Sequence, residues 1–166
     1  MSQFVVNPYR ADPYANFKFQ VIWEGRPVAG ISRVSALTRR TEVIEYRDGA
    51  APSRSLKSPG RTHFDPITLE RGVTHDREFE AWANQVANVQ GDAAISLQDF
   101  RKHVILNLLN EQGTVAISYR LYNCWVSEFQ ALPDLDANGP VTAIERLVLV
   151  TEGWDRDREV TEPAQT

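Results

Sequence analysis

Residues 16 to 25 read NFKFQVIWEG, a segment in which apolar and polar side chains alternate almost without a break. Alternate residues of a β-strand point to opposite faces of a sheet, so the pattern predicts a half-buried strand that ends at Glu24-Gly25. A strand of this kind needs a second apolar layer over its buried face, which limits the chain to folds built from packed sheets. The side chains expected on the buried face are Phe17, Phe19, Val21 and Trp23.

Strands are predicted along most of the remaining chain. A proline near the start of one of them, Pro66, indicates a strand entry or an edge position, because proline cannot donate to a ladder. The short apolar run before Asn110 fits a helix or a strand, and its β-branched content and the following NEQG turn favour a strand. The predicted strands cover residues 28–46, 62–72, 99–110, 114–129 and 143–154.

One helix is predicted after residue 74, where Thr74 or Asp76 can cap its first turn. Phe79, Trp82 and Val86 follow at helical spacing and predict one apolar face, and the helix is expected to end around residues 88–92. Six or seven strands with a single helix indicate a mostly-β sandwich or barrel on which one helix packs.

The chain divides into three parts by composition. A polar, proline-punctuated arm is expected over residues 1–15, one β-domain over 16–156 and a frayed tail over 157–166. Because no basic and then apolar leader begins the sequence, the chain is expected to fold in the cytoplasm. A net charge of −4 argues against a surface that binds nucleic acid over its whole extent.

Residues 47 to 61, RDGAAPSRSLKSPGR, form the most unusual segment. It holds two prolines, two glycines and four basic residues against one acid, and its only large apolar residue is Leu56. The composition predicts an extended loop, and loops of this length are usually functional or disordered. One hypothesis is that it contacts another protein, and the alternative is a small β-barrel module that binds nucleic acid or another anionic ligand through this loop. The candidate site residues are Arg47, Asp48, Arg54, Leu56, Lys57 and Arg61.

No catalytic, cofactor-binding or metal-binding set is predicted. Residues 134–145 match D-x-D-x-N-G-x5-E, the pattern of a calcium-binding EF-hand loop, but the flanking segments are predicted strands, so a plain turn is expected. The three histidines are far apart and predict surface positions, without zinc-ligand spacing. The aromatic residues Trp23 and Trp82 and the single cysteine Cys124 are expected in the core. The histidines are His63, His75 and His103.

Several specific phrases follow one another along the chain: ITLERG (67–72), LYNCW (121–125) and the Glu152-Gly153 pair after the last strand. Taken in order, these phrases and their flanking segments resemble the tail tube proteins of contractile phages and of phage tail-like contractile injection systems. The resemblance spans roughly residues 12 to 156. The chain departs from the family at Ser35-Ala36-Leu37, where the family often has Ser-Gly-Leu, and at Trp125-Val126, where it often has Trp-Pro.

This resemblance implies a structural protein without enzymatic activity or cofactor. The expected fold is a β-sandwich or split β-barrel with one helix, and the expected assembly is a hexameric ring that stacks into a hollow tube. The expected partners are other copies of the chain, a sheath protein, baseplate or hub proteins, tube-terminating proteins and effector cargo in the lumen, without insertion of the subunit into a membrane. The loop over residues 47–61 would then reach a neighbouring subunit.

Overall fold

The computed structural model describes residues 18–50, 53–87, 100–139, 142–161 and 163. Within these ranges the chain forms one helix and ten strands, more strands than the six or seven expected, because three of the predicted strands are each divided in two and a strand of two residues is added. The strands are β1 (Phe19–Trp23), β2 (Arg26–Pro27), β3 (Ile31–Val34), β4 (Arg39–Arg47), β5 (Ser55–Phe64), β6 (Ile67–Gly72), β7 (Lys102–Leu109), β8 (Val115–Gln130), β9 (Ile144–Val150) and β10 (Gly153–Arg156), and the helix is α1 (Glu78–Val86).

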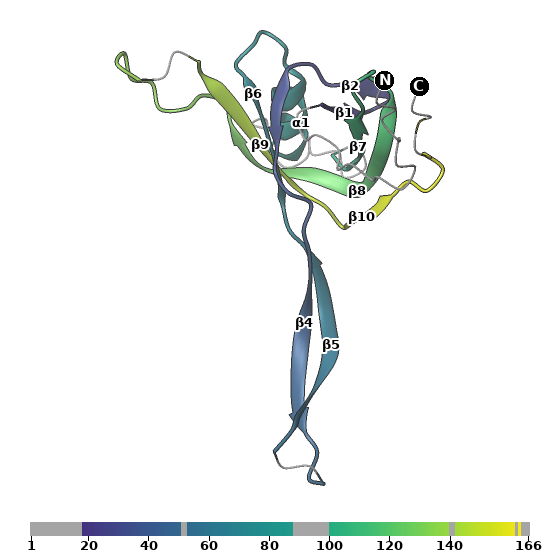
Figure 1. Cartoon of the computed structure of the whole chain (residues 1–166). Helices are drawn as coiled ribbons and strands as arrows, with labels where there is room; N and C mark the ends of the chain where they lie inside the picture. Colours follow the sequence, from purple (N-terminus) through teal and green to yellow (C-terminus); the bar gives the residue numbers. More distant parts are fainter. Residues whose placement is uncertain (1–17, 51–52, 88–99, 140–141, 162, 164–166) are drawn as a thin grey trace, which may run out of the picture.

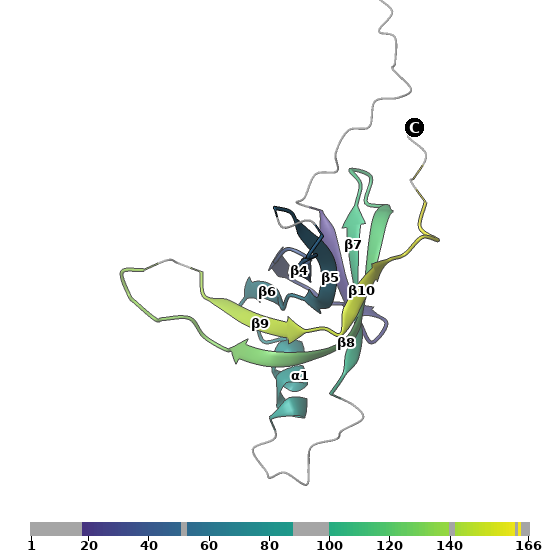
Figure 2. The same cartoon turned by 90° about the horizontal axis from the view of Figure 1, so that it is seen from below.

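Eight strands form one curved sheet around the core, in the order β2-β1-β7-β8-β9-β6-β3, with β10 also paired to β8. The long strand β8 joins the two halves, because its first part pairs with β7 and its last part with β9. Between these parts Asn123 has a φ of 50°, in the left-handed region, and Figure 2 shows β8 curving toward β9. One strand therefore serves both halves of the split β-fold that the sequence predicts.

The helix predicted from Phe79 and Trp82 is present as α1. Its N-cap is Arg77, which makes no side-chain cap hydrogen bond, so the predicted cap at Thr74 or Asp76 is wrong. Asp76 still supports the first turn, because its Oδ1 accepts a hydrogen bond of 3.0 Å from the backbone N–H of Glu78. Thr74 plays a different part, because its hydroxyl accepts a bond from the N–H of Asp76. Residues 88–92, where the helix was expected to end, lie outside the described ranges, and α1 ends at Val86.

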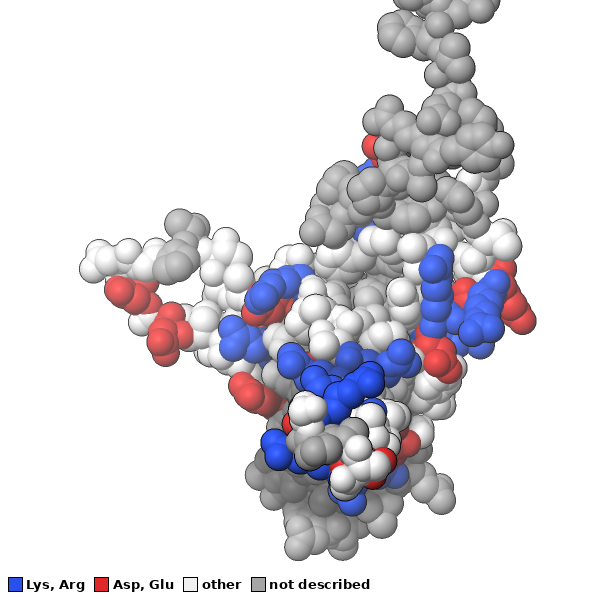
Figure 3. All heavy atoms as spheres, turned by 60° about the horizontal axis from the view of Figure 1, so that its bottom comes forward, with Lys and Arg blue, Asp and Glu red and all other residues white. Residues whose placement is uncertain are grey.

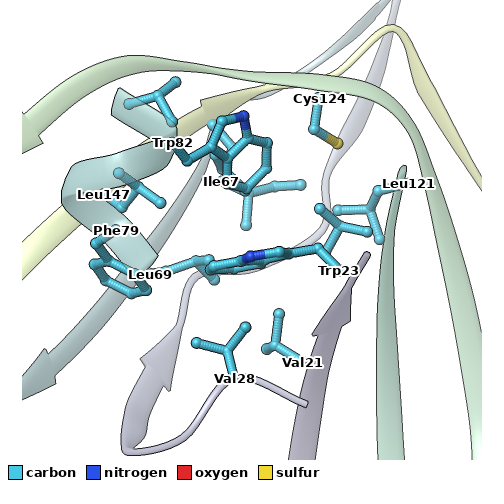
Figure 4. Packing of buried hydrophobic residues seen from close by; sticks show 13 residues of the cluster. Val21, Trp23, Val28, Ile67, Leu69, Phe79, Trp82, Leu121, Cys124 and Leu147 are labelled. Atoms are coloured by element: carbon cyan, nitrogen blue, oxygen red, sulfur yellow. The ribbon is translucent and has the colours of Figure 1, made fainter. Parts of the chain in front are cut away.

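Aromatic side chains from the helix and the sheet meet in the core (Figure 4). Phe79 and Trp82 of α1 are fully buried, and the Trp82 ring lies 4.9 Å from that of Trp23 in β1. The buried indole of Trp82 also donates a 2.8 Å hydrogen bond to the carbonyl of Phe100. Truncating an aromatic core side chain to alanine usually costs about 3–5 kcal/mol, so this contact accounts for a large share of the stability. The core positions predicted for Trp23 and Trp82 are confirmed.

Cys124 is buried in β8, as expected for a small apolar residue in the core. Burial raises the pKa of its thiol from 9.0 to about 11, and hydrogen bonds with Thr151 and with the backbone of Val104 only partly offset this effect. The thiol is therefore protonated near neutral pH.

We expect Cys124 to react with iodoacetamide at pH 8 much more slowly in the folded protein than in denaturant, because the thiolate is the nucleophile and the thiol is shielded. The raised pKa also means that the unfolded chain loses this proton first as the pH rises, so the free energy of unfolding should fall between pH 9 and about 11. Mass spectrometry of alkylated samples measures the rates, and equal rates in the two states would contradict this assignment.

The segment predicted as an extended loop is mostly a strand. Residues 55–61 belong to β5, which pairs with β4 in a two-stranded ribbon that projects far from the main sheet (Figure 1). Gly60 permits close pairing, because a Cβ there would lie 3.1 Å from the side chain of Ile44. Pro59 pairs with Val43, next to the point where the register shifts. The polar composition therefore reflects a ribbon surrounded by solvent, and an unpaired loop over 47–61 is wrong.

Pro66 lies at a strand entry, as predicted, because β6 begins at the next residue, Ile67. It lies between β5 and β6 and divides the predicted strand over residues 62–72 in two. The missing N–H makes this position suitable for the break, since the chain changes here from the ribbon to the main sheet.

The predicted N-terminal arm over residues 1–15 lies outside the described residues, as does Phe17. Of the predicted tail over 157–166, the structure describes 157–161 and 163, and the proposed domain boundaries stay predictions. No helix in the part of the chain that is described has the length and apolar character needed to cross a membrane.

Candidate functional site

The ribbon of β4 and β5, which we call the arm (residues 39–64), is anchored firmly at its root. The ring of Phe64 meets Trp154 edge-on at 5.7 Å, and Trp154 meets Tyr119 in the same way. The side chain of Arg40 contacts Asp65 at 2.9 Å, which ties the start of the arm to its end. The root is therefore part of the domain, while the rest of the arm extends into solvent.

The two faces of the arm differ in polarity. The register pairs Tyr46 with Leu56 and places Ile44 on the same face two residues earlier. These three apolar side chains are 52%, 38% and 51% exposed. A two-stranded ribbon is only marginally stable by itself in water. An exposed apolar strip on such a ribbon indicates a surface that another protein covers.

The predicted site residues all lie on the arm or its tip. Leu56 belongs to the apolar strip, and Lys57 forms an exposed ion pair of 3.8 Å with Glu45. The carboxylate of Asp48 accepts a hydrogen bond from the N–H of Ala50 and so supports the turn at the tip. No acidic group among the described residues pairs with the remaining three, and Figure 3 shows basic side chains gathered over the arm. These three exposed residues are Arg47, Arg54 and Arg61.

Sequence reasoning missed the apolar strip apart from Leu56. Ile44 and Tyr46 belong to a segment that was predicted to be a strand of the domain, where such residues are normally buried. Their exposure follows from the length of the hairpin, which carries them away from the sheet. The sequence signal that could have indicated a free ribbon is a strand-like segment, EVIEY, followed after a turn by a polar segment of similar length, SLKSP.

The connection between β8 and β9 (residues 131–143) forms a second projection (Figures 1 and 2). It contains the calcium-loop pattern, which the structure shows to be a turn between strands, as predicted. Asp136 accepts hydrogen bonds from the N–H groups of Asn138 and Gly139, through its carboxylate at 2.9 Å and its carbonyl at 3.0 Å. No group of potential metal ligands was found among the residues that the structure describes.

A buried ion pair explains the last acid of that pattern, Glu145. Its carboxylate bonds to the guanidinium of Arg71, and both side chains are almost fully buried. Arg71 also contacts the carboxylate of Asp76 at 3.3 Å and donates to its carbonyl at 2.8 Å. Its guanidinium stacks 4.1 Å from the ring centre of Phe79. Arg71 thus joins β6, β9 and the start of α1, a role that no sequence pattern predicted.

A hollow of about 570 Å³ lies beside the β8–β9 connection. Its lining includes Asp134, Leu135, Ile144 and Arg146. Leu135 is 75% exposed although it borders this hollow, and the neighbouring Leu132 is 54% exposed. The hollow therefore combines apolar side chains with three acids, Glu70, Asp134 and Asp136, and one base, Arg146, and no described segment covers it.

The three histidines lie at the surface, as predicted. His63 in β5 contacts Glu42 across the arm at 2.9 Å, and His103 lies edge-on to Tyr122. His75 is exposed just before α1. None of them joins a set of groups suited to catalysis.

Comparison with known proteins supports the same interpretation. Residues 15–155 match the family model described as T4-like virus tail tube protein gp19. Comparison with curated proteins gives no match.

Among solved structures, a chain of the anti-feeding prophage tube-terminating cap has a TM-score of 0.74 and 24% identity, covering 95% of this chain and 99% of that one. A chain of the PVC sheath–tube complex, an extracellular contractile injection system in its extended state, gives 0.71 and 24%, covering 87% and 91%. Hcp1 from Flavobacterium johnsoniae gives 0.54 and 13%, covering 89% and 98%. These likenesses confirm the predicted tail-tube-like fold.

Proposed function

This chain belongs to the T4-like virus tail tube protein gp19 family, and from that membership we propose that it is a structural subunit of the inner tube of a contractile phage tail or phage tail-like injection system. Copies of the chain form hexameric rings, and the rings stack into a hollow tube. The tube conducts or carries cargo through a target envelope when the sheath contracts. The family match over nearly the whole chain carries this proposal.

The arm supports an assembling role. Its exposed apolar strip, Ile44, Tyr46 and Leu56, has no counterpart on the chain's own domain that could cover it, because the arm projects away from the sheet (Figure 1). A contact between different surfaces of identical copies closes into a ring when the rotation allows it. The arm residues predicted as a site are proposed to contact a neighbouring subunit in this assembly.

The proposed partners follow from the assemblies in which similar chains were solved. These include a sheath–tube complex, a baseplate and a tube-terminating cap. We propose the same classes of partner here, together with effector cargo in the lumen. The subunit acts without turnover or cofactor, folds in the cytoplasm and ends in the assembled particle.

The alternative, a module that binds nucleic acid through the basic segment, has no support from the family or the structural neighbours. The arm also carries an apolar strip and acids of its own, whereas phosphate-binding surfaces are strongly and evenly basic. Retention on a nucleic-acid column at low salt that disappears at higher salt would favour this alternative.

Electron microscopy of the purified protein tests the proposal. We expect rings at high protein concentration, and tubes when sheath or baseplate partners are supplied. Size-exclusion chromatography with light scattering should give the mass of a closed oligomer. A strictly monomeric species under all these conditions would contradict a tube function.

A further inference from the structure

The arm and the β8–β9 connection carry opposite charges. The arm, residues 39–64, holds six Lys and Arg residues against three Asp and Glu residues, a net charge of +3 without His63. The β8–β9 connection, residues 131–143, holds Asp134 and Asp136 and no Lys or Arg. Figure 3 shows this separation, with basic side chains over the arm and only acidic ones on the extension formed by the connection.

Apolar residues accompany the charges on both surfaces. On the arm, the basic residues Arg47 and Lys57 follow Tyr46 and Leu56 directly in the chain, so they flank the apolar strip from the other face of the narrow ribbon. On the connection, Leu132 and Leu135 are the two leucines that are more than half exposed. An apolar centre with a polar rim is the usual composition of a protein–protein interface. The arm and the connection therefore carry opposite charges, and both also carry exposed apolar side chains.

The arm and the connection of one chain cannot pair with each other. The arm and the connection leave the sheet in different directions (Figure 1), and no ion pair links them among the described residues. The arm's cations Arg47 and Arg54 have no acidic partner in the described part of the chain. A second copy can bring its connection to this arm, since identical chains can pair unlike surfaces head to tail.

We propose that the apolar strip of one copy's arm docks into the hollow beside the β8–β9 connection of a neighbouring copy, which brings Arg47 and Arg54 at the tip of the arm near the acids of that connection. The hollow of about 570 Å³ has room for one or two large side chains, and Leu135 and Ile144 give it apolar walls. The acids of the connection steer the basic arm toward it and select its orientation. This inference rests on the proposed tube function and names the surface that receives the arm.

A charge exchange tests the docking. The arm variant is Arg47→Glu/Arg54→Glu, and the connection variant is Asp134→Lys/Ala137→Lys, which leaves the turn at Asp136 intact. At low salt each variant alone should raise the protein concentration needed for assembly by at least about tenfold, because like charges then face each other. A chain that carries all four substitutions should assemble close to the wild-type concentration, because the attraction is restored with its sign exchanged.

Sedimentation velocity and electron microscopy measure assembly, and circular dichroism confirms that each variant is folded. Glu111→Lys/Glu159→Lys is the matched control, since both side chains are exposed and distant in sequence from the two surfaces. In about 1 M salt, where the Debye length falls to about 3 Å, the differences between the variants should shrink.

The possible results of these experiments distinguish the proposed docking from the tube function on which it rests. If both charge variants assemble normally, the proposed docking is wrong and the tube function stands. The same holds if the chain that carries all four substitutions does not recover assembly. A connection variant that assembles normally but loses a sheath protein assigns the hollow to that protein and overturns self-docking. A wild-type chain that never assembles overturns the tube function and the docking together.

Discussion

Shortening the arm should abolish assembly while the domain stays folded. Thr41 and Thr62 face each other in the register, with their hydroxyls 3.0 Å apart. Replacing residues 42–61 by Asn-Gly would close the hairpin at this pair with a favoured two-residue turn. None of the core residues lies in the deleted segment, and the root contacts of Phe64 with Trp154 remain. We therefore expect a stable monomer that forms no stacked rings.

Circular dichroism and thermal unfolding would check the fold of this variant, and electron microscopy its assembly. Tyr46→Ser/Leu56→Ser is a milder test that keeps the backbone and removes two of the three apolar side chains of the strip, and it should weaken assembly strongly. Val43→Thr is the matched control, because Val43 is 63% exposed on the opposite face of the arm. Tubes that form normally without the arm would show that its assignment to the assembly is wrong.

Replacing Arg71 by leucine should destabilise the domain by about 3–5 kcal/mol, because the buried carboxylate of Glu145 would lose its charged partner. The substitution also removes the bonds to Asp76 at the start of α1 and the stacking on Phe79. Since small domains have about 5–15 kcal/mol of stability in total, such a loss threatens folding itself. The double substitution Arg71→Leu/Glu145→Leu should recover a large part of the loss, because no uncompensated charge then remains buried.

Urea unfolding followed by tryptophan fluorescence measures the free energy of unfolding of each variant. Arg33→Leu provides the control, because the Arg33 side chain is 65% exposed and its partner Glu70 keeps a second ion pair, with Arg146. Surface pairs of this kind contribute about 0–1 kcal/mol. Equal losses for Arg71→Leu and Arg33→Leu would contradict the structural role given to Arg71.

The strands and the helix followed largely from local patterns. Alternation around Val21 and Trp23 and the helical spacing of Phe79 and Trp82 report burial directly, because each period matches the geometry of its element. The turn over residues 134–139 was also predictable, since Asp, Asn and Gly are turn formers and the flanking segments are strands. Ordered phrases along the chain were enough to indicate the tail tube family, and the family match confirms it.

The structure of the arm could not be predicted from local sequence patterns. Residues 55–61 have the composition of a loop, but pairing with β4 makes them a strand, and strand pairing depends on residues distant in sequence. The same pairing places Tyr46 and Leu56 side by side and exposes them. A pattern of residues indicates which faces are apolar, and it cannot indicate whether a neighbouring strand or solvent lies against them.

The amino-acid sequence by itself determined the mostly-β class, the single helix, the absence of a recognisable catalytic motif and the resemblance to tail tube proteins. Only the tertiary structure decided that the segment over 47–61 is mostly the paired end of a projecting ribbon, and that Arg71 and Glu145 meet in the core across 74 residues of chain. The physical reason is the same in both cases. Local patterns specify the conformation of a segment and its apolar face, whereas partners across the fold depend on sheet order and register, which the whole chain sets together.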